Sequence, residues 1–246
     1  MLKHFIIRNL HSLLGFEDYL FTFTIFKIST LSLYKNKKEF IYFTTLFPKN
    51  ANIIVIGANT GITTIPIAKN VPSGKVFAIE PIPVNFKTLQ RVIKYFKFFH
   101  IEPINIALGN ENKEIEMVMP IVENTKSHGL CHIDDKNIRE TKAGIKFKVL
   151  MKKLDDIFSS FNGKIDGMKI VAENYEWFIF DGGKELIAKH RPLIYCELWF
   201  NNSRSKVLEQ IKSWNYEIKV LEGNKLIQYN SQFHFTPCFF FVPKDS

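Results

Sequence analysis

Short apolar runs alternate with longer amphipathic segments from residue 52 onward. Asn52–Gly57 (NIIVIG), Lys75–Pro81 and Glu102–Gly109 read as strands, and the first two lack the polar alternation of a half-exposed strand. Between strands, apolar residues recur at helical spacing. The spacing predicts helices ending near Asn70 and spanning residues 84–98. The pattern therefore predicts strand, helix and strand in succession, with the strands buried on both faces.

The second half of the chain continues this alternation and then changes to strands alone. Buried strands are predicted over residues 164–171 and 192–199, and helices over 175–189 and 203–214. Polar and apolar residues alternate over 113–120 and 144–153, which predicts two antiparallel strands flanking a loop at 121–143. Further strands are expected within residues 216–222, 225–229 and 233–243. The order indicates an α/β fold with an open, mostly parallel sheet and helices on both faces.

Length and composition fit one globular unit. The 246 residues are 46% hydrophobic and 23% charged, enough for a single core. We expect an N-terminal helical segment at residues 1–48 and one compact domain at 49–246. The three cysteines are far apart and form no paired motif, which suits a reducing, cytoplasmic setting. No spacing of His, Cys and Asp indicates a metal site, and the oligomeric state is not readable.

The net charge of +9 admits an anionic partner, although lysines on solvated faces explain it more simply. On the helix at 84–98 the aromatic residues occupy one stripe and the lysines another, so no stacking surface for nucleic acid is expected. The apolar stretch Tyr19–Tyr34 is interrupted by Lys27 and by hydroxyl residues, well short of a spanning helix. It is expected to be a buried helix, with weak contact to a membrane surface as the alternative.

A glycine turn follows the first predicted strand. In Gly57–Gly61 (GANTG) the glycines allow a sharp turn and the close approach of a ligand, and a helix begins just after it. The spacing lacks the third glycine of the pyrophosphate fingerprint, which favours a cofactor without phosphate, such as S-adenosylmethionine. Glu80 ends the second strand 23 positions after Gly57, where a carboxylate can accept both hydroxyls of a ribose. A solvated carboxylate at a strand end is the simpler interpretation of Glu80.

The sequence resembles the FkbM-type S-adenosylmethionine-dependent methyltransferases. The resemblance rests on six blocks in the family's order: GANTG, AIEPIPVNFKTL, NIALGN, KKLDDIF, MKIVAENYE and RPLIYCEL. It implies the seven-stranded class I methyltransferase sheet and O-methylation, often of sugar hydroxyls on glycans, glycolipids or glycosylated small molecules. It also implies a cofactor site with the methionine end at the glycine turn, the ribose at Glu80 and the adenine near 105–108. The expected cofactor-binding residues are Gly57, Ala58, Asn59, Thr60, Gly61, Glu80, Pro81, Asn85, Ala107 and Leu108.

Two positions depart from the family pattern. Val55 stands where the family usually has an Asp that helps hold the ammonium end of the cofactor, and Val171 replaces an Asp at the end of the fourth strand. Asn174 also stands where the family has glycine, while Glu173 and Glu176 remain. These departures keep a second hypothesis open, a catalytically impaired binding protein with the same fold. A Rossmann-type nucleotide-sugar or dinucleotide enzyme is the third.

Methyl transfer to a hydroxyl needs an aligned acceptor and a group that takes its proton. Glu173 is the expected base from the motif, and a loop carboxylate is its simpler interpretation. His128 is the second candidate because its loop could cover the site, although an exposed loop histidine without catalytic duty is the plainer reading. The sequence does not identify the acceptor.

Overall fold

The computed structural model describes residues 14–33, 37–122, 125–133, 144–200 and 202–244, and an eight-stranded sheet forms its centre. The strands lie in the order β12-β11-β13-β10-β9-β1-β2-β3. Their bounds are β1 (Ile53–Ile56), β2 (Val76–Ile79), β3 (Ile101–Ile104), β9 (Gly167–Ile170), β10 (Leu193–Glu197), β11 (Tyr216–Glu222), β12 (Lys225–Gln228) and β13 (Cys238–Pro243).

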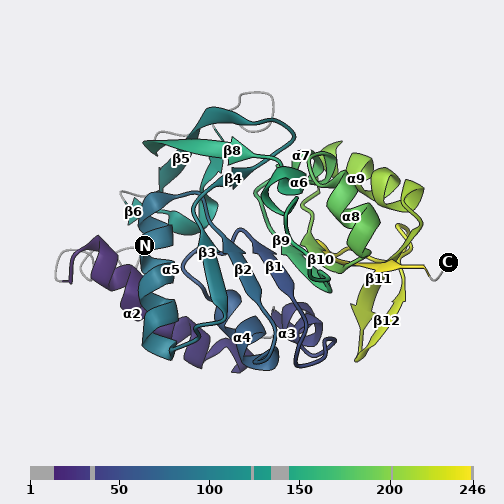
Figure 1. Ribbon diagram of the computed structural model, residues 1–246, viewed down its shortest axis with the longest axis horizontal. Helices are drawn as coiled ribbons and strands as arrows, with labels where there is room; N and C mark the ends of the chain where they lie inside the picture. The colour runs from purple at the N-terminus through teal and green to yellow at the C-terminus, as the bar shows by residue number, and fades with distance from the viewer. Residues whose placement is uncertain (1–13, 34–36, 123–124, 134–143, 201, 245–246) are drawn as a thin grey trace.

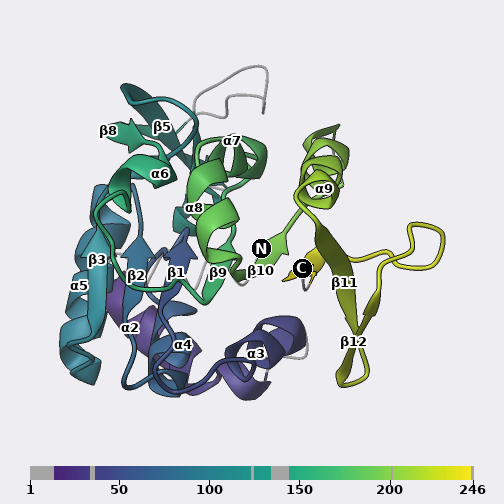
Figure 2. The ribbon, with the colours of Figure 1, turned by 45° about the vertical axis from the view of Figure 1, so that its right-hand side comes forward.

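The sheet is mixed. The five strands from β10 to β3 pair in parallel, whereas β13, β11 and β12 pair antiparallel. Every residue of β1 and β2 is buried, as the continuous apolar runs predicted, and every residue of β9 is buried although it includes Lys169. The expectation of seven strands is corrected to eight, because β12 adds a hairpin beside β11 (Figure 2).

Helices cover both faces, so the predicted α/β class is confirmed (Figure 1). One face packs against residues from α6 (Leu154–Ile157), α7 (Glu176–Asp181), α8 (Lys184–His190) and α9 (Asn202–Ser213). The other face packs against α3 (Lys38–Thr44), α4 (Thr64–Asn70) and α5 (Pro83–Phe96). Alternate residues of a strand point to opposite faces, so Ile54 lies in the first core and Val55 in the second.

A second, smaller sheet lies beside the main one. Its strands are β4 (Ala107–Leu108), β5 (Lys113–Val122), β6 (Thr125–Lys126), β7 (His132–Ile133) and β8 (Gly144–Lys152). The predicted antiparallel pair at 113–120 and 144–153 is confirmed as β5 and β8. The single strand expected at 102–109 is wrong: β3 joins the main sheet, while β4 leaves it to pair with β8.

The prediction of one continuous helix at 175–189 is also wrong. The helix is broken into α7 and α8 at Gly182 and Gly183. A Cβ atom at Gly182 would lie 2.0 Å from the carbonyl oxygen of Gly109, so the chain passes too close there for any other residue. Asp155 supports the new helix start, since its carboxylate accepts the backbone N–H groups of Glu185 and Leu186.

The N-terminal region forms α2 (Phe16–Ser29), the short 3₁₀ helix η1 (Leu31–Leu33) and α3. The stretch expected to be one buried helix to Tyr34 ends its α-helix at Ser29, and Tyr34 lies outside the described residues. Burial is partial, since Leu20 is buried whereas Phe26 is 58% exposed. Among the described residues, no helix combines the length and the apolar character that crossing a membrane requires.

Candidate functional site

A cavity of about 270 Å³ lies at the carboxyl ends of the parallel strands. The strand order arranges its wall as a row: Glu197 ends β10, Lys169 lies in β9, Gly57 follows β1, Glu80 follows β2, and Leu108 lies in β4, after β3. Residues from the second sheet and from the 3₁₀ helix η3 (His128–Leu130) form the opposite wall. The cavity therefore changes from charged at β9 and β10 to apolar beyond β3.

Close packing and a left-handed backbone require glycine at both ends of the turn. Gly57 has a φ of 69°, and a Cβ atom there would lie 2.0 Å from the carbonyl oxygen of Val171. Gly61 has a φ of 106°, and its Cβ would lie 3.1 Å from the side chain of Leu89 in α5. The turn is thus held between the end of β9 and a helix, and the N–H groups of Gly57 and Ala58 both donate to the carbonyl oxygen of Ile79.

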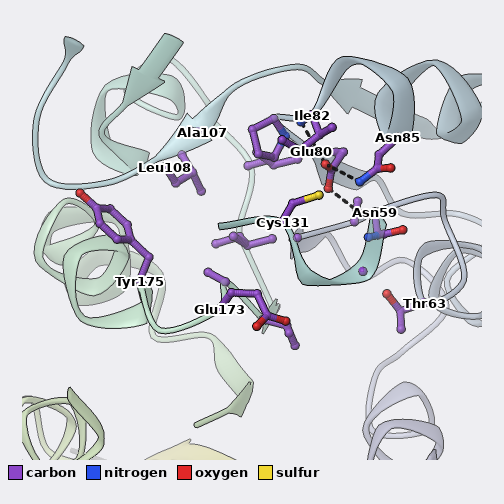
Figure 3. A pocket seen from close by; sticks show the side chains of 18 of the residues that line it. Asn59, Thr63, Glu80, Ile82, Asn85, Ala107, Leu108, Cys131, Glu173 and Tyr175 are labelled. Carbon is purple, nitrogen blue, oxygen red and sulfur yellow. Dashed lines mark hydrogen bonds between the residues drawn. The ribbon is translucent and has the colours of Figure 1, made fainter. Parts of the chain in front are cut away.

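Glu80 is buried and tightly held (Figure 3). Its Oε2 accepts the backbone N–H of Asn59 at 2.9 Å, and its Oε1 accepts the backbone N–H of Ile82 at 3.0 Å and an amide N–H of Asn85 at 3.3 Å. Burial raises the pKa of Glu80 to about 7, against the opposing effect of these donors. The carboxylate borders the cavity but is not solvated, so the simpler interpretation of its sequence position does not hold.

The helix η3 covers this part of the cavity. The carbonyl oxygen of His128 accepts side-chain N–H groups from Asn59 at 3.0 Å and from Asn85 at 3.2 Å. The His128 ring nitrogen Nδ1 lies 3.0 Å from Asn59 Oδ1, and the ring packs edge-on against Phe23 of α2. Cys131 follows η3 and points its sulfur toward Glu80 (Figure 3). The cover and the strand ends are thus joined by hydrogen bonds.

The charged end of the cavity combines two cations and a carboxylate. Lys169 is 3% exposed and donates to the carbonyl oxygen of Gly57 at 3.2 Å. Glu197 accepts the hydroxyl of Tyr195 at 3.1 Å and lies 3.9 Å from the ammonium of Lys37. Burial lowers the pKa of Lys169 to about 8, partly offset by the negative charge of Glu197.

Comparison with known proteins identifies the family. The sequence profile of the methyltransferase FkbM domain matches residues 56–228, more than two thirds of the chain. The chain belongs to the FkbM methyltransferase family. No curated protein sequence matches it.

Solved structures agree with this fold. The methyltransferase FkbM from Methylobacillus flagellatus KT is 14% identical, with a TM-score of 0.53 over 80% of this chain and 44% of its own. The present chain therefore spans less than half the length of that protein. An O-methyltransferase from Bacillus cereus, solved in complex with SAH, is 12% identical, with a TM-score of 0.53 and 97% of each chain covered. The predicted family and the class I methyltransferase fold are confirmed.

Eight of the ten residues expected to bind the cofactor border the cavity. They are Gly57, Ala58, Asn59, Glu80, Pro81, Asn85, Ala107 and Leu108. Thr60 and Gly61 do not: Thr60 is buried and accepts a hydrogen bond from Thr24 at 2.6 Å, and Gly61 packs on α5. The binding roles of all ten remain predictions.

The two expected catalytic residues, Glu173 and His128, both border the cavity, from opposite walls. Glu173 and Asn174 have φ values of 48° and 77°, a left-handed backbone in which asparagine is among the better tolerated residues. This explains how Asn174 can stand where the family has glycine. Val171 also borders the cavity, whereas Val55 is fully buried on a face of the sheet and is not part of the wall.

The residues of the wall that the sequence analysis did not assign to the site include Lys37, Cys131, Lys169, Tyr175 and Glu197. Glu197 could have been found, since it is the only acid in its predicted strand and stands near that strand's carboxyl end. Lys37 lies before the block of family resemblance, and nothing in its local sequence places it near β10. Cys131 and Tyr175 reach the cavity only through the folding of the second sheet and of the segment after β9.

Proposed function

We propose that this protein is an S-adenosylmethionine-dependent O-methyltransferase that modifies a hydroxyl group of a sugar-containing acceptor. The observation that carries the proposal is the order of groups along the cavity. Apolar residues beyond β3, the Glu80 carboxylate after β2 and the glycine turn after β1 match the adenine, ribose and amino-acid parts of the cofactor.

The apolar part of the wall fits a flat base. Leu108 and Tyr175 lie beside each other at this end (Figure 3), and Ala107 and Met117 also contribute to the wall. Leu108 and Ala107 are buried, and the ring of Tyr175 is fixed by stacking on Phe178 with a centroid distance of 4.4 Å. Rigid apolar surfaces with a few placed polar groups are typical of cofactor sites.

S-adenosylmethionine supplies an activated methyl group when bound. The chain has to hold the acceptor hydroxyl in line with that group and accept its proton. We assign the proton acceptor to Glu173, which borders the cavity next to the end of β9, with the imidazole of His128 as the second candidate. The left-handed backbone at Glu173 is the kind of strained conformation that clusters at functional sites.

The hydroxylated acceptor is supported by the family resemblance and by the Bacillus cereus O-methyltransferase of the same fold. We expect the acceptor to bind near η3, where His128 and Asn59 offer polar groups at the cavity wall. We propose no nucleic-acid partner.

A second candidate function is that of a cofactor-binding protein without transferase activity. Val55 and Val171 favour it because both replace acids that the family carries, and Glu80 is already hydrogen-bonded by three groups of the protein itself. The two candidates share the cavity and differ in whether a proton acceptor meets a bound hydroxyl.

Isothermal titration calorimetry of the full chain with S-adenosylmethionine, SAH and NAD tests the cofactor. We expect binding of the first two and none of NAD; indifference to both at millimolar concentration excludes the proposal. Isotope-labelled S-adenosylmethionine is then offered with a panel of free sugars, nucleotide sugars and glycolipids. Label recovered on a hydroxyl supports the transferase, and loss of transfer but not of binding in Glu173→Gln assigns the base. Binding without transfer to any acceptor class supports the second candidate.

A further inference from the structure

Lys169 is the buried cation nearest to the glycine turn. It lies in β9, is 3% exposed and borders the cavity, and its ammonium group donates to the carbonyl oxygen of Gly57 at 3.2 Å. A fully buried lysine is rare in proteins unless it is paired, because taking its charge out of water is costly. Its position therefore calls for a specific counter-charge.

That counter-charge is incomplete within the protein. Within the described ranges, the Gly57 carbonyl is the only hydrogen-bond acceptor of Lys169, and no carboxylate forms an ion pair with it. An ammonium group has three donors, so two of its N–H bonds have no protein acceptor in this part of the chain. Since the side chain borders the cavity, a ligand oxygen can reach them.

The neighbouring strand does not supply the missing charge. Val55 of β1 is paired in register with Lys169 of β9, and both are buried. The family usually carries an acid at this position, but a valine side chain offers neither charge nor acceptor. The carboxylate with the largest electrostatic effect on Lys169 is that of Glu197, at the end of β10. Glu197 borders the same cavity and lies 3.9 Å from the ammonium group of Lys37.

This end of the cavity thus presents the ammonium groups of Lys169 and Lys37 together with the carboxylate of Glu197, beside the glycine turn. A ligand part with one carboxylate and one ammonium group is complementary to such a set. The α-amino-acid end of S-adenosylmethionine has this composition. By contrast, adenine and ribose carry no charge and would leave Lys169 unpaired.

We propose that Lys169 binds the α-carboxylate of the cofactor and that Glu197 binds its ammonium group, in place of an acid at position 55. The inference rests on the proposed function, because it requires S-adenosylmethionine in this cavity. It makes the loss of the acid at Val55 compatible with cofactor binding, since the charges come from β9 and β10 instead.

The test compares two ligands that differ only in the group at issue. SAH carries the amino-acid end, and 5′-methylthioadenosine has the same adenosine and sulfur without it. Both are titrated calorimetrically into the full-length wild type, Lys169→Met, Glu197→Gln and the control Lys94→Met, which removes an exposed lysine of α5. Methionine matches the length and apolar stem of lysine, and Lys169→Met breaks no ion pair among the described residues. The Glu197 side chain is 17% exposed, so glutamine can be solvated there. The variants are therefore expected to fold, and thermal unfolding checks this.

We expect Lys169→Met and Glu197→Gln to weaken the binding of SAH by about 10- to 100-fold, which is the range for the loss of one charge-assisted hydrogen bond. Their affinity for 5′-methylthioadenosine should stay within about twofold of the wild type, and Lys94→Met should change neither. Equal weakening of both ligands, or an unchanged affinity for SAH in Lys169→Met, overturns the inference and leaves the proposed function standing. A wild type that binds neither ligand overturns both.

Discussion

Glu80→Gln should change how the stability of the protein depends on pH. In the folded protein burial raises the pKa of Glu80 from 4.5 to about 7. Between these values the folded chain holds a proton that the unfolded chain has released. The free energy of unfolding therefore falls as pH rises through this window, the opposite of the usual behaviour of a paired carboxylate. Glutamine does not titrate, so the variant lacks this fall.

The expected size follows from the two pKa values. From about pH 5 to about pH 8 the linkage relation gives a loss of about 2.5 kcal/mol in the wild type. The glutamine amide places an N–H group against a donor that Glu80 now accepts, from Asn59 or Ile82. Compared with the protonated Glu80 of the wild type near pH 5, this costs about 1–3 kcal/mol, and the stability of the variant then stays level while that of the wild type falls. The variant should be clearly less stable than the wild type near pH 5 and close to it near pH 8.

Urea unfolding followed by tryptophan fluorescence measures both profiles. Glu102→Gln is the matched control, because Glu102 is an exposed carboxylate on the neighbouring strand β3. The quantity to compare is the difference between variant and wild type at each pH, which cancels the titration of all other groups. Parallel profiles for wild type and Glu80→Gln would refute the reasoning, since Glu80 would then titrate alike in the folded and unfolded chains.

Three further substitutions test the packing around the site. Gly57→Ala should lower the free energy of unfolding by more than about 3 kcal/mol in a urea titration, because the added Cβ meets the Val171 carbonyl. Its control is Gly223→Ala, where the backbone is also left-handed but no atom lies near the added Cβ; this control should lose only about 1–2 kcal/mol. Asp155→Ala removes the acceptor of two N–H groups at the start of α8 and should cost about 1 kcal/mol, measured by thermal unfolding. Thr24→Val removes a buried hydroxyl–hydroxyl bond between α2 and the glycine turn and should cost about 1–2 kcal/mol in urea; an unchanged value contradicts that contact.

The sequence predicted the parts of the fold that depend on local pattern. Strands buried on both faces are typically continuous apolar runs, so β1 and β2 were recognisable without any partner. The glycine turn and Glu80 followed from their places at strand ends, because parallel strands bring their carboxyl ends to one edge. The helix break at Gly182 was not predictable, since its cause is the backbone of Gly109, which is distant in sequence.

The site was harder to predict because its contacts join distant segments. Asn59 and Asn85 were expected at the cofactor, but their hydrogen bonds to the carbonyl oxygen of His128 depend on the position of η3, within the loop predicted at 121–143. Residues 123–124 and 134–143 of that segment lie outside the described part of the chain. Lys169 and Glu197 are 28 positions apart, and only the pairing of β9 with β10 brings them to one end of the cavity.

The hydrogen bonds of Glu80 decide how a ribose can be held under the proposed function. Oε1 already accepts two donors, from Ile82 and Asn85, whereas Oε2 accepts one, from Asn59. A carboxylate oxygen has two lone pairs, so Oε2 retains an acceptor site in the described structure. One ribose hydroxyl can therefore bind Oε2 with η3 in place. A second hydroxyl on Oε1 requires Asn85 to turn away. This also breaks one of the two side-chain amide hydrogen bonds to the His128 carbonyl and leaves the one from Asn59. Full engagement of the ribose therefore weakens the contact between α5 and η3.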